Sequence, residues 1–98
     1  MAIEVRWSPE AYDDIEMIAD YISRDSVNYA SSVVKTILGK TRNLELFPKS
    51  GRVVPEFENE FIRETFAYHY RIIYEIKSQD VVLILTIVHG NRELKILE

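Results

Sequence analysis

The fold of this 98-residue chain is decided by the stretch Val81-Val82-Leu83-Ile84-Leu85-Thr86-Ile87-Val88. Every residue in it except Thr86 is apolar, at even and odd positions alike. A β-strand carries apolar residues at successive positions when both of its faces are buried. The stretch is also far too short to cross a lipid bilayer. We therefore expect a central strand of a sheet.

Two more strands are predicted before this stretch, over residues 61–67 and 68–77. In the second one, aromatic and apolar residues fall on even positions, and charged residues such as Arg71 fall between them. Alternation with a period of two predicts a strand with one buried face and one solvated face. The polar residues Ser78-Gln79-Asp80 predict a tight turn, so we expect the last two strands to pair antiparallel.

The N-terminal half predicts one strand followed by two helices. Residues 3–7 alternate between apolar and charged, as in a half-buried strand. Ser8-Pro9-Glu10 then has the features of a helix start, with a hydroxyl cap, proline at the first helical position and an acid near the positive end of the helix dipole. Apolar stripes with helical spacing follow on either side of Asp25-Ser26, and the second stripe ends near Phe47-Pro48.

These elements predict an α+β fold with the order β-αα-βββ. The link between the two helices is very short, so they form an antiparallel helical hairpin. We expect this hairpin to pack on one side of a mainly antiparallel, four-stranded sheet. Residues 48–60 are predicted to be the main loop.

The composition is that of an ordinary globular protein, with 47% hydrophobic and 29% charged residues. A chain of this length forms one domain, which we place at residues 1–98. The sequence has no cysteine, which excludes disulfides, thiolate zinc sites and iron–sulfur clusters. Charged residues interrupt the N-terminal segment, so we predict no signal peptide and expect a cytoplasmic protein without a membrane-spanning segment.

The formal net charge of −4 is unevenly distributed along the chain. Residues 1–25 contain seven acidic and two basic residues, whereas residues 35–52 contain five basic residues and one acidic residue. This asymmetry permits an anionic partner at the basic segment, although a charged helix face is most often simply solvated.

Several kinds of site can be set aside. Only His69 and His89 are available as imidazole ligands, and the carboxylates are scattered, so we predict no metal site. The three glycines are not clustered, which excludes dinucleotide and P-loop motifs, and no motif indicates a serine nucleophile. We therefore expect no cofactor.

Six residues remain as candidates for chemistry: Arg52, Glu56, Arg63, Arg71, His89 and Arg92. Metal-free cleavage of RNA needs a base for the 2′-hydroxyl proton, an acid for the leaving oxygen, and cations that stabilise the charged phosphorane. A carboxylate, an imidazole and arginines are groups of these kinds. The same residues are equally well explained as solvated strand and loop residues, so their types alone leave both interpretations open.

The order of short motifs along the chain resembles that of a known family. The motifs are Pro9-x-Ala11, Leu44-x-x-Phe47-Pro48-x-x-Gly51-Arg52-x-x-Pro55-Glu56, Arg63-Glu64, Tyr70-Arg71-Ile72-x-Tyr74 and Val88-His89-x-x-Arg92. Their sequence and spacing resemble the RelE/ParE superfamily, the toxin halves of type II toxin–antitoxin modules, from residue 3 to about 94. The resemblance implies a cognate antitoxin as partner, with a segment that packs across the toxin. It leaves open whether the chain forms a homodimer or a toxin–antitoxin hetero-oligomer.

The resemblance implies two kinds of target. RelE-like and YoeB-like members cut messenger RNA on the ribosome, and ParE-like members poison DNA gyrase without a nuclease site. In the YoeB-like arrangement, Glu56 matches the base, Arg71 the residue that stabilises the phosphate and His89 the acid. Arg63 matches a further phosphate ligand, and we assign it to nucleic-acid binding together with Arg52 and Arg92.

We favour a ribosome-dependent, metal-free mRNA endoribonuclease, because the glutamate, arginine and histidine positions are all filled. The first alternative is a ParE-like gyrase inhibitor, in which Arg63, Arg71 and Arg92 are sheet-face residues. The second is an inactive member that only binds its antitoxin. The acidic net charge favours both alternatives, since docking on a ribosome is largely electrostatic.

The register of the last two strands provides a physical check on the nuclease. With a two-residue turn, Arg71 lies opposite Thr86 and His89 opposite Tyr68, so Arg71 and His89 are on opposite faces. A three- or five-residue turn, or a β-bulge, would bring both to one face. A shared nuclease site requires the second arrangement.

Overall fold

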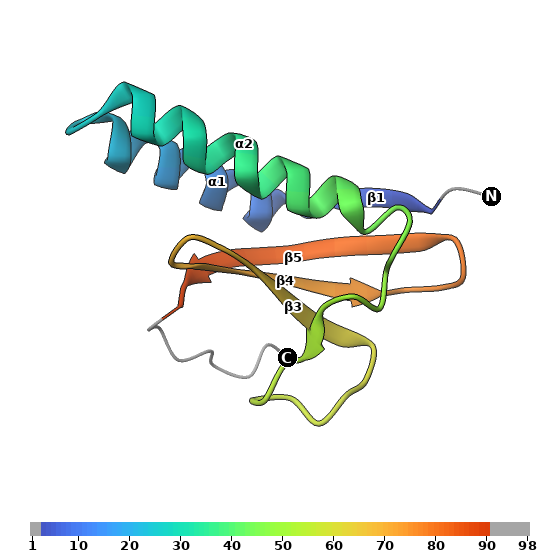
Figure 1. Ribbon diagram of the computed structural model, residues 1–98. Helices are drawn as coiled ribbons and strands as arrows, with labels where there is room; N and C mark the ends of the chain where they lie inside the picture. Colours follow the sequence, from blue (N-terminus) through green and yellow to red (C-terminus); the bar gives the residue numbers. More distant parts are fainter. Residues whose placement is uncertain (1–2, 91–98) are drawn as a thin grey trace.

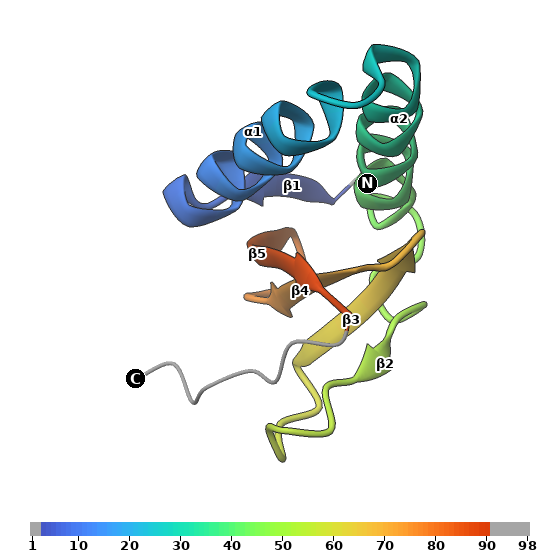
Figure 2. The same cartoon turned by 90° about the vertical axis from the view of Figure 1, so that its left-hand side faces the viewer.

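In the computed structural model, which describes residues 3–90, two helices cover one face of a five-stranded sheet (Figure 1). The elements are β1 (Glu4–Trp7), α1 (Pro9–Ser23), α2 (Val27–Asn43), β2 (Arg52–Val53), β3 (Ile62–Ala67), β4 (Tyr70–Ile76) and β5 (Val81–His89). Figure 2, turned by 90°, shows both helices on the same side of the sheet. The α+β class and the helical hairpin are therefore confirmed.

The strand order is β1-β5-β4-β3-β2. β1 pairs with β5 in parallel and all other pairs are antiparallel. The apolar strand β5 lies between β1 and β4, which confirms its interior position.

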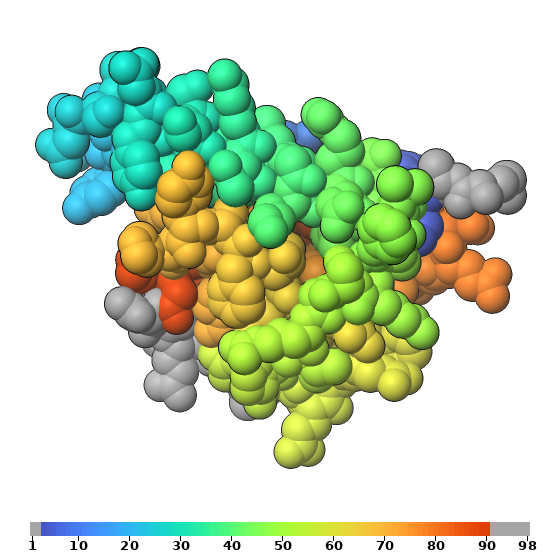
Figure 3. All heavy atoms as spheres, viewed as in Figure 1, coloured from blue at the N-terminus to red at the C-terminus, as the bar shows by residue number. Residues whose placement is uncertain are grey.

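The short strand β2 was not predicted, so the sheet has five strands rather than four. It lies within the expected loop 48–60, where Arg52 pairs with Glu64 and Val53 with Arg63 of β3. Two residues are too few to show a period in the sequence, and their pairing depends on a partner strand that is distant along the chain. Figure 3 shows the green and yellow residues of this segment packed below α2.

Both helices begin at the predicted caps. The hydroxyl of Ser8 accepts a hydrogen bond from Ala11 N at 3.0 Å, and the hydroxyl of Ser26 accepts one from Tyr29 N at 3.1 Å. The helices bury one face each against the sheet, where the core includes Val33 and Ile37 of α2.

The second face of β4 is not solvated as the alternation predicted. Arg71 is only 6% exposed, and Ile73 is fully buried. The expectation of a solvated face was wrong because the loop after β2 returns to this side of the sheet, where Glu56 binds Arg71.

Candidate functional site

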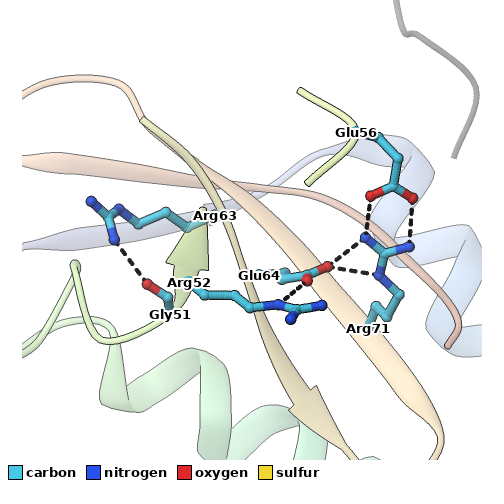
Figure 4. A network of polar contacts seen from close by, with 6 residues as sticks. All are labelled: Gly51, Arg52, Glu56, Arg63, Glu64 and Arg71. Atoms are coloured by element: carbon cyan, nitrogen blue, oxygen red, sulfur yellow. Dashed lines mark hydrogen bonds and ion pairs between the residues drawn. The ribbon is translucent and has the colours of Figure 1, made fainter. Parts of the chain in front are cut away.

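Four charged side chains of alternating sign form a chain of ion pairs across the face of the sheet opposite the helices (Figure 4). We call Arg52, Glu64, Arg71 and Glu56 the charged ladder. Arg52 Nε donates to one carboxylate oxygen of Glu64, and Arg71 Nε donates to the other at 2.7 Å. The two terminal nitrogens of Arg71 then donate to the two oxygens of Glu56, at 2.9 and 2.8 Å.

The middle of the charged ladder is buried and its first member is exposed. The side chain of Glu64 has no exposed surface, that of Arg71 is 7% exposed, and that of Arg52 is 61% exposed. Hydrogen bonds from Arg71 to Glu56 raise the pKa of Arg71 above its usual range; burial opposes this shift, and the contact with Glu64 adds to it. Arg71 is therefore a charged group whose burial is compensated by two carboxylate partners.

Strand pairing explains how the sequence builds the charged ladder. Arg52 lies directly opposite Glu64 in the β2–β3 pair, so their side chains share a face. Arg71 lies opposite Phe66 in the β3–β4 pair, one diagonal position from Glu64 on the same face. The guanidinium of Arg52 also lies over the Phe66 ring, 5.3 Å from its centre.

A second set of contacts anchors the start of the loop. The hydroxyl of Tyr74, a fully buried residue, donates to Pro48 O at 2.7 Å and accepts from Gly51 N at 3.0 Å. A Cβ on Gly51 would lie 2.5 Å from Glu64 O and 2.6 Å from the Tyr74 hydroxyl, so only glycine fits. Arg63 NH1 donates to Gly51 O at 2.9 Å.

Arg63 therefore takes part in the loop and not in the charged ladder. The contact with Gly51 is drawn in Figure 4. The Nε of Arg63 donates to Glu60 O at 2.9 Å, so both of these contacts are with loop carbonyls. Its partner across the β3–β4 pair is Tyr74, whereas that of its neighbour Glu64 is Ile73, so Arg63 and Glu64 lie on opposite faces.

The connection between β4 and β5 departs from a two-residue turn in two ways. Ile76 lies opposite Val82, so residues 77–81 separate the first paired positions of the two strands, with Val81 already part of β5. The pairing then shifts at a β-bulge, where β5 carries the extra residue Leu85. Either departure alone would bring Arg71 and His89 to one face of the sheet.

The two departures cancel each other. Arg71 lies opposite Val88, and His89 lies opposite Tyr70. Adjacent residues of a strand point to opposite faces, so Arg71 and His89 are on different sides of the sheet. The His89 ring is on the side of the helices, with its centre 5.7 Å from that of Tyr70.

Residues of α1 and its cap hold the bulge in place. Ser8 donates its backbone N–H to Ile84 O at 3.0 Å and its hydroxyl to Leu85 O at 2.8 Å. The carboxylate of Asp14 accepts hydrogen bonds from the Thr86 hydroxyl and from Ile87 N. The end of β5, and with it His89, is thus oriented by contacts with the first helix.

The structure brings together some of the predicted site residues and separates others. Glu56, Arg71 and Arg52 share one network, whereas Arg63 and His89 lie elsewhere, and Arg92 lies outside the described residues. Glu64 is not among the six candidates predicted from the sequence, although it joins Arg52 to Arg71. The signal that could have revealed it was a carboxylate inside a predicted strand, beside a strand that carries an arginine.

In this arrangement Arg71 holds the carboxylate of Glu56 in place, which is unfavourable for acid–base chemistry at Glu56. Both oxygens of Glu56 accept hydrogen bonds from Arg71, and a base would have to break them to take a proton. Within residues 3–90, no group of three or more histidine, cysteine or acidic side chains could hold a metal ion. No helix in that part of the chain combines the length and apolarity needed to cross a membrane.

Comparisons with known proteins agree with the fold. The family model described as "ParE toxin of type II toxin-antitoxin system, parDE" matches residues 5–94. A chain of the chromosomal ParDE toxin–antitoxin system from P. aeruginosa is similar in structure, with a TM-score of 0.72 and 20% identity, over 89% of this chain and 95% of that one. A chain of the RelBE2 toxin–antitoxin complex from Mycobacterium tuberculosis has a TM-score of 0.61 and 22% identity, over 91% and 99%. No curated protein matched in sequence.

Proposed function

Because this chain belongs to the family of ParE toxins of type II toxin–antitoxin systems, we propose that it acts by binding DNA gyrase and not by cutting RNA. Gyrase is the target that the ParE-like branch of the superfamily implies. Both gyrase and the ribosome are cytoplasmic, so we propose the cytoplasm as the site of action.

The observation that carries this proposal is the placement of Arg71 and His89 on opposite faces of the sheet. A nuclease of the YoeB-like kind needs its base, its phosphate-binding arginine and its acid around a single phosphate. Here the matching base, Glu56, is clamped to Arg71, and the matching acid is on the side of the helices. A toxin that acts by binding needs none of these groups to converge.

We also propose that the chain binds a cognate antitoxin, as the family description implies. A groove of about 820 Å³ between α1 and α2 offers a receptor for an apolar segment. Its apolar lining comes from both helices: Met17, Ala19, Val27, Ala30 and Val34.

A ribosome-dependent mRNA endoribonuclease is the second candidate. It is favoured by the direct contact of Glu56 with Arg71 and by the basic segment 35–52. In that function Glu56 would be the base, Arg71, Arg52 and Arg63 would contact phosphates, and His89 would have to reach the same phosphate from the other face.

The variant Glu56→Gln separates the two candidates. Glutamine keeps the size of the side chain and a hydrogen-bond acceptor for Arg71, but it cannot act as a base. The chain and the variant are induced in cells without antitoxin, and growth, RNA ends and gyrase-linked DNA breaks are measured. We expect both proteins to arrest growth, with DNA breaks and intact transcripts.

The control for this experiment is Glu4→Gln, which removes the charge of an exposed carboxylate paired with Arg6, outside the charged ladder. If Glu56→Gln no longer arrests growth, if Glu4→Gln still does, and if wild-type cells contain cut transcripts, the nuclease is correct and the gyrase proposal is wrong. Unfolding curves of the purified proteins show whether either variant has lost its fold.

A further inference from the structure

Six aromatic side chains gather at one end of the molecule, which we call the aromatic end: Tyr21, Tyr29, Tyr68, His69, Tyr70 and His89. They come from the end of α1, the start of α2, the β3–β4 turn with the start of β4, and the end of β5. All of these lie at the left of Figure 1 and face the viewer in Figure 2. In Figure 3 the orange residues of the β3–β4 turn lie directly below α2.

The rings contact one another across these elements. Tyr29 meets Tyr68 edge to face with ring centres 5.6 Å apart, and Tyr70 meets His89 in the same way. The rings of His69 and His89 are stacked at 6.2 Å. Burial raises the pKa of Tyr70, and the nearby hydroxyls of Tyr29 and Tyr21 raise it further. The aromatic end is therefore an ordered surface and not a set of separate side chains.

Much of this ordered surface faces solvent. Tyr21 is 70% exposed, Tyr68 50% and Tyr29 43%. Tyr29 and Tyr68 hold each other in place by their ring contact, so they lose little conformational entropy on binding. Tyrosine is also one of the residues that most often dominate protein interfaces.

Tyr68 is also the only non-glycine residue among residues 3–90 with a positive φ, at 55°. This left-handed conformation is unfavourable for a side chain with a Cβ, and glycine or asparagine usually occupies it. A tyrosine at this position lowers the stability of the chain but places its ring at the tip of the turn. Strained residues of this kind cluster at functional sites.

The charge of the adjoining helix indicates the kind of partner. The helix α1, residues 9–23, contains five acidic residues and no basic one; Asp20 is next to Tyr21 and Glu16 is about one turn before it, whereas the other three lie near the start of the helix. A nucleic-acid backbone would be repelled by this helix, and so would the same surface of a second copy. A basic protein segment would be attracted to it, and its guanidinium or ammonium groups could stack on the tyrosine rings.

We propose that the aromatic end is a docking surface for an arginine- or lysine-bearing segment of the toxin's target protein. The inference rests on the proposed function, because it takes the target to be a protein. It assigns target binding to a particular surface of the molecule. Neither the charged ladder nor the groove between the helices includes the residues of this surface.

Two variants test the proposal, Tyr68→Gly and Tyr21→Ala, with Tyr12→Ala as the matched control. Tyr12 is 55% exposed and sits at the start of α1, beside Trp7 and away from the aromatic end. Growth arrest in cells and binding to purified gyrase are measured. We expect Tyr68→Gly and Tyr21→Ala to weaken both by about tenfold or more, as removal of an interface tyrosine commonly does, and Tyr12→Ala to change neither.

Stability separates a binding role of Tyr68 from a structural one. Glycine relieves the left-handed strain, so Tyr68→Gly should unfold at the same denaturant concentration as wild type or a higher one. A lower denaturant midpoint of Tyr68→Gly together with unchanged growth arrest would overturn the proposal. Full growth arrest by both Tyr68→Gly and Tyr21→Ala would also overturn it.

The two proposals fail in different ways. If the wild type arrests growth without binding gyrase and both variants are still defective, the docking surface stands and the gyrase proposal fails. The chemistry of the partner is tested with an arginine-rich peptide and an oligouridine RNA as probes in NMR titrations. Shifts of the Tyr68 and His69 signals with the peptide support the proposal, and shifts with the RNA alone contradict it.

Discussion

Glu64 is the residue on which the charged ladder depends. Each of its two carboxylate oxygens accepts from a different arginine, and its side chain has no exposed surface. Such a group cannot be removed without leaving Arg71 short of a partner inside the sheet. The ladder therefore fixes the loop that carries Glu56 to the face opposite the helices.

Replacement of Glu64 should cost far more stability than replacement of its exposed partner. We expect Glu64→Ala to lower the free energy of unfolding by about 2 kcal/mol or more, because the buried Arg71 loses one of its two carboxylate partners and its Nε is left without an acceptor. Arg52→Ala should cost less than about 1 kcal/mol, because the guanidinium is largely solvated. Urea unfolding of the three proteins measures both values; equal losses would show that Glu64 is not the centre of the ladder.

Two glycines make a matched pair for testing the loop anchor. A Cβ on Gly51 would overlap Glu64 O and the Tyr74 hydroxyl, whereas a Cβ on Gly39, inside α2, meets no atom within 4 Å. We expect Gly51→Ala to destabilise the chain by about 2 kcal/mol or more. Gly39→Ala should stabilise it by about 0.5–1 kcal/mol, since alanine is the better helix former. Thermal unfolding shows whether each variant is more or less stable than wild type. A Gly51→Ala variant with the stability of wild type would mean that the loop is not anchored here.

The buried hydroxyl of Tyr74 predicts a dependence of stability on alkaline pH. Burial raises the pKa of Tyr74 in the folded chain above its value in the unfolded chain, about 10. Its contribution to stability is therefore complete below pH 10 and is lost as the pH rises through the folded pKa. Tyr74→Phe, which lacks the two hydroxyl hydrogen bonds, should be less stable at pH 8, and its deficit should shrink at pH 11. A deficit that stays constant between these pH values contradicts this account.

Among the elements, the bulge on β5 has the largest consequence for the proposed function. The extra residue Leu85 and the long connection before it each shift the register, and together they leave His89 on the side of the helices. The bulge is fixed by Ser8 and Asp14, which are distant from it along the chain. The first helix thus decides the direction of a side chain at the end of the last strand.

The two helix caps allow this coupling to be measured. The hydroxyl of Ser26 caps α2 through one hydrogen bond from Tyr29 N, whereas the hydroxyl of Ser8 caps α1 and also donates to Leu85 O. We expect Ser26→Ala to cost about 1 kcal/mol. Ser8→Ala should cost about 2 kcal/mol, because a carbonyl of the bulge also loses its donor. Chemical unfolding compares the two variants, and equal costs would mean that Ser8 acts only as a cap.

The elements also show what sequence can and cannot predict. The strand over residues 81–88 and both serine caps follow from local patterns, and the structure confirms them. The short strand β2 and the register after Leu85 depend on contacts between distant segments, which no local pattern encodes. For the same reason, the types of the candidate residues could be predicted, but not which of them meet.

At the scale of the whole molecule, the charged ladder and the aromatic end occupy different surfaces. The charged ladder closes the face opposite the helices, and the exposed tyrosines lie at the end where the helices and strands meet. The acidic residues of α1 near that end suit a basic partner. These placements are the basis of our proposal that the chain acts by binding a protein.

The most direct test of this account uses purified toxin in two parallel reactions. In one, DNA gyrase supercoils a plasmid; in the other, ribosomes translate a defined messenger RNA. The account predicts that the toxin inhibits gyrase or traps broken DNA, in proportion to its concentration, while the messenger RNA stays intact on the ribosome. Cleavage of the messenger RNA, with gyrase unaffected at the same toxin concentration, would contradict it.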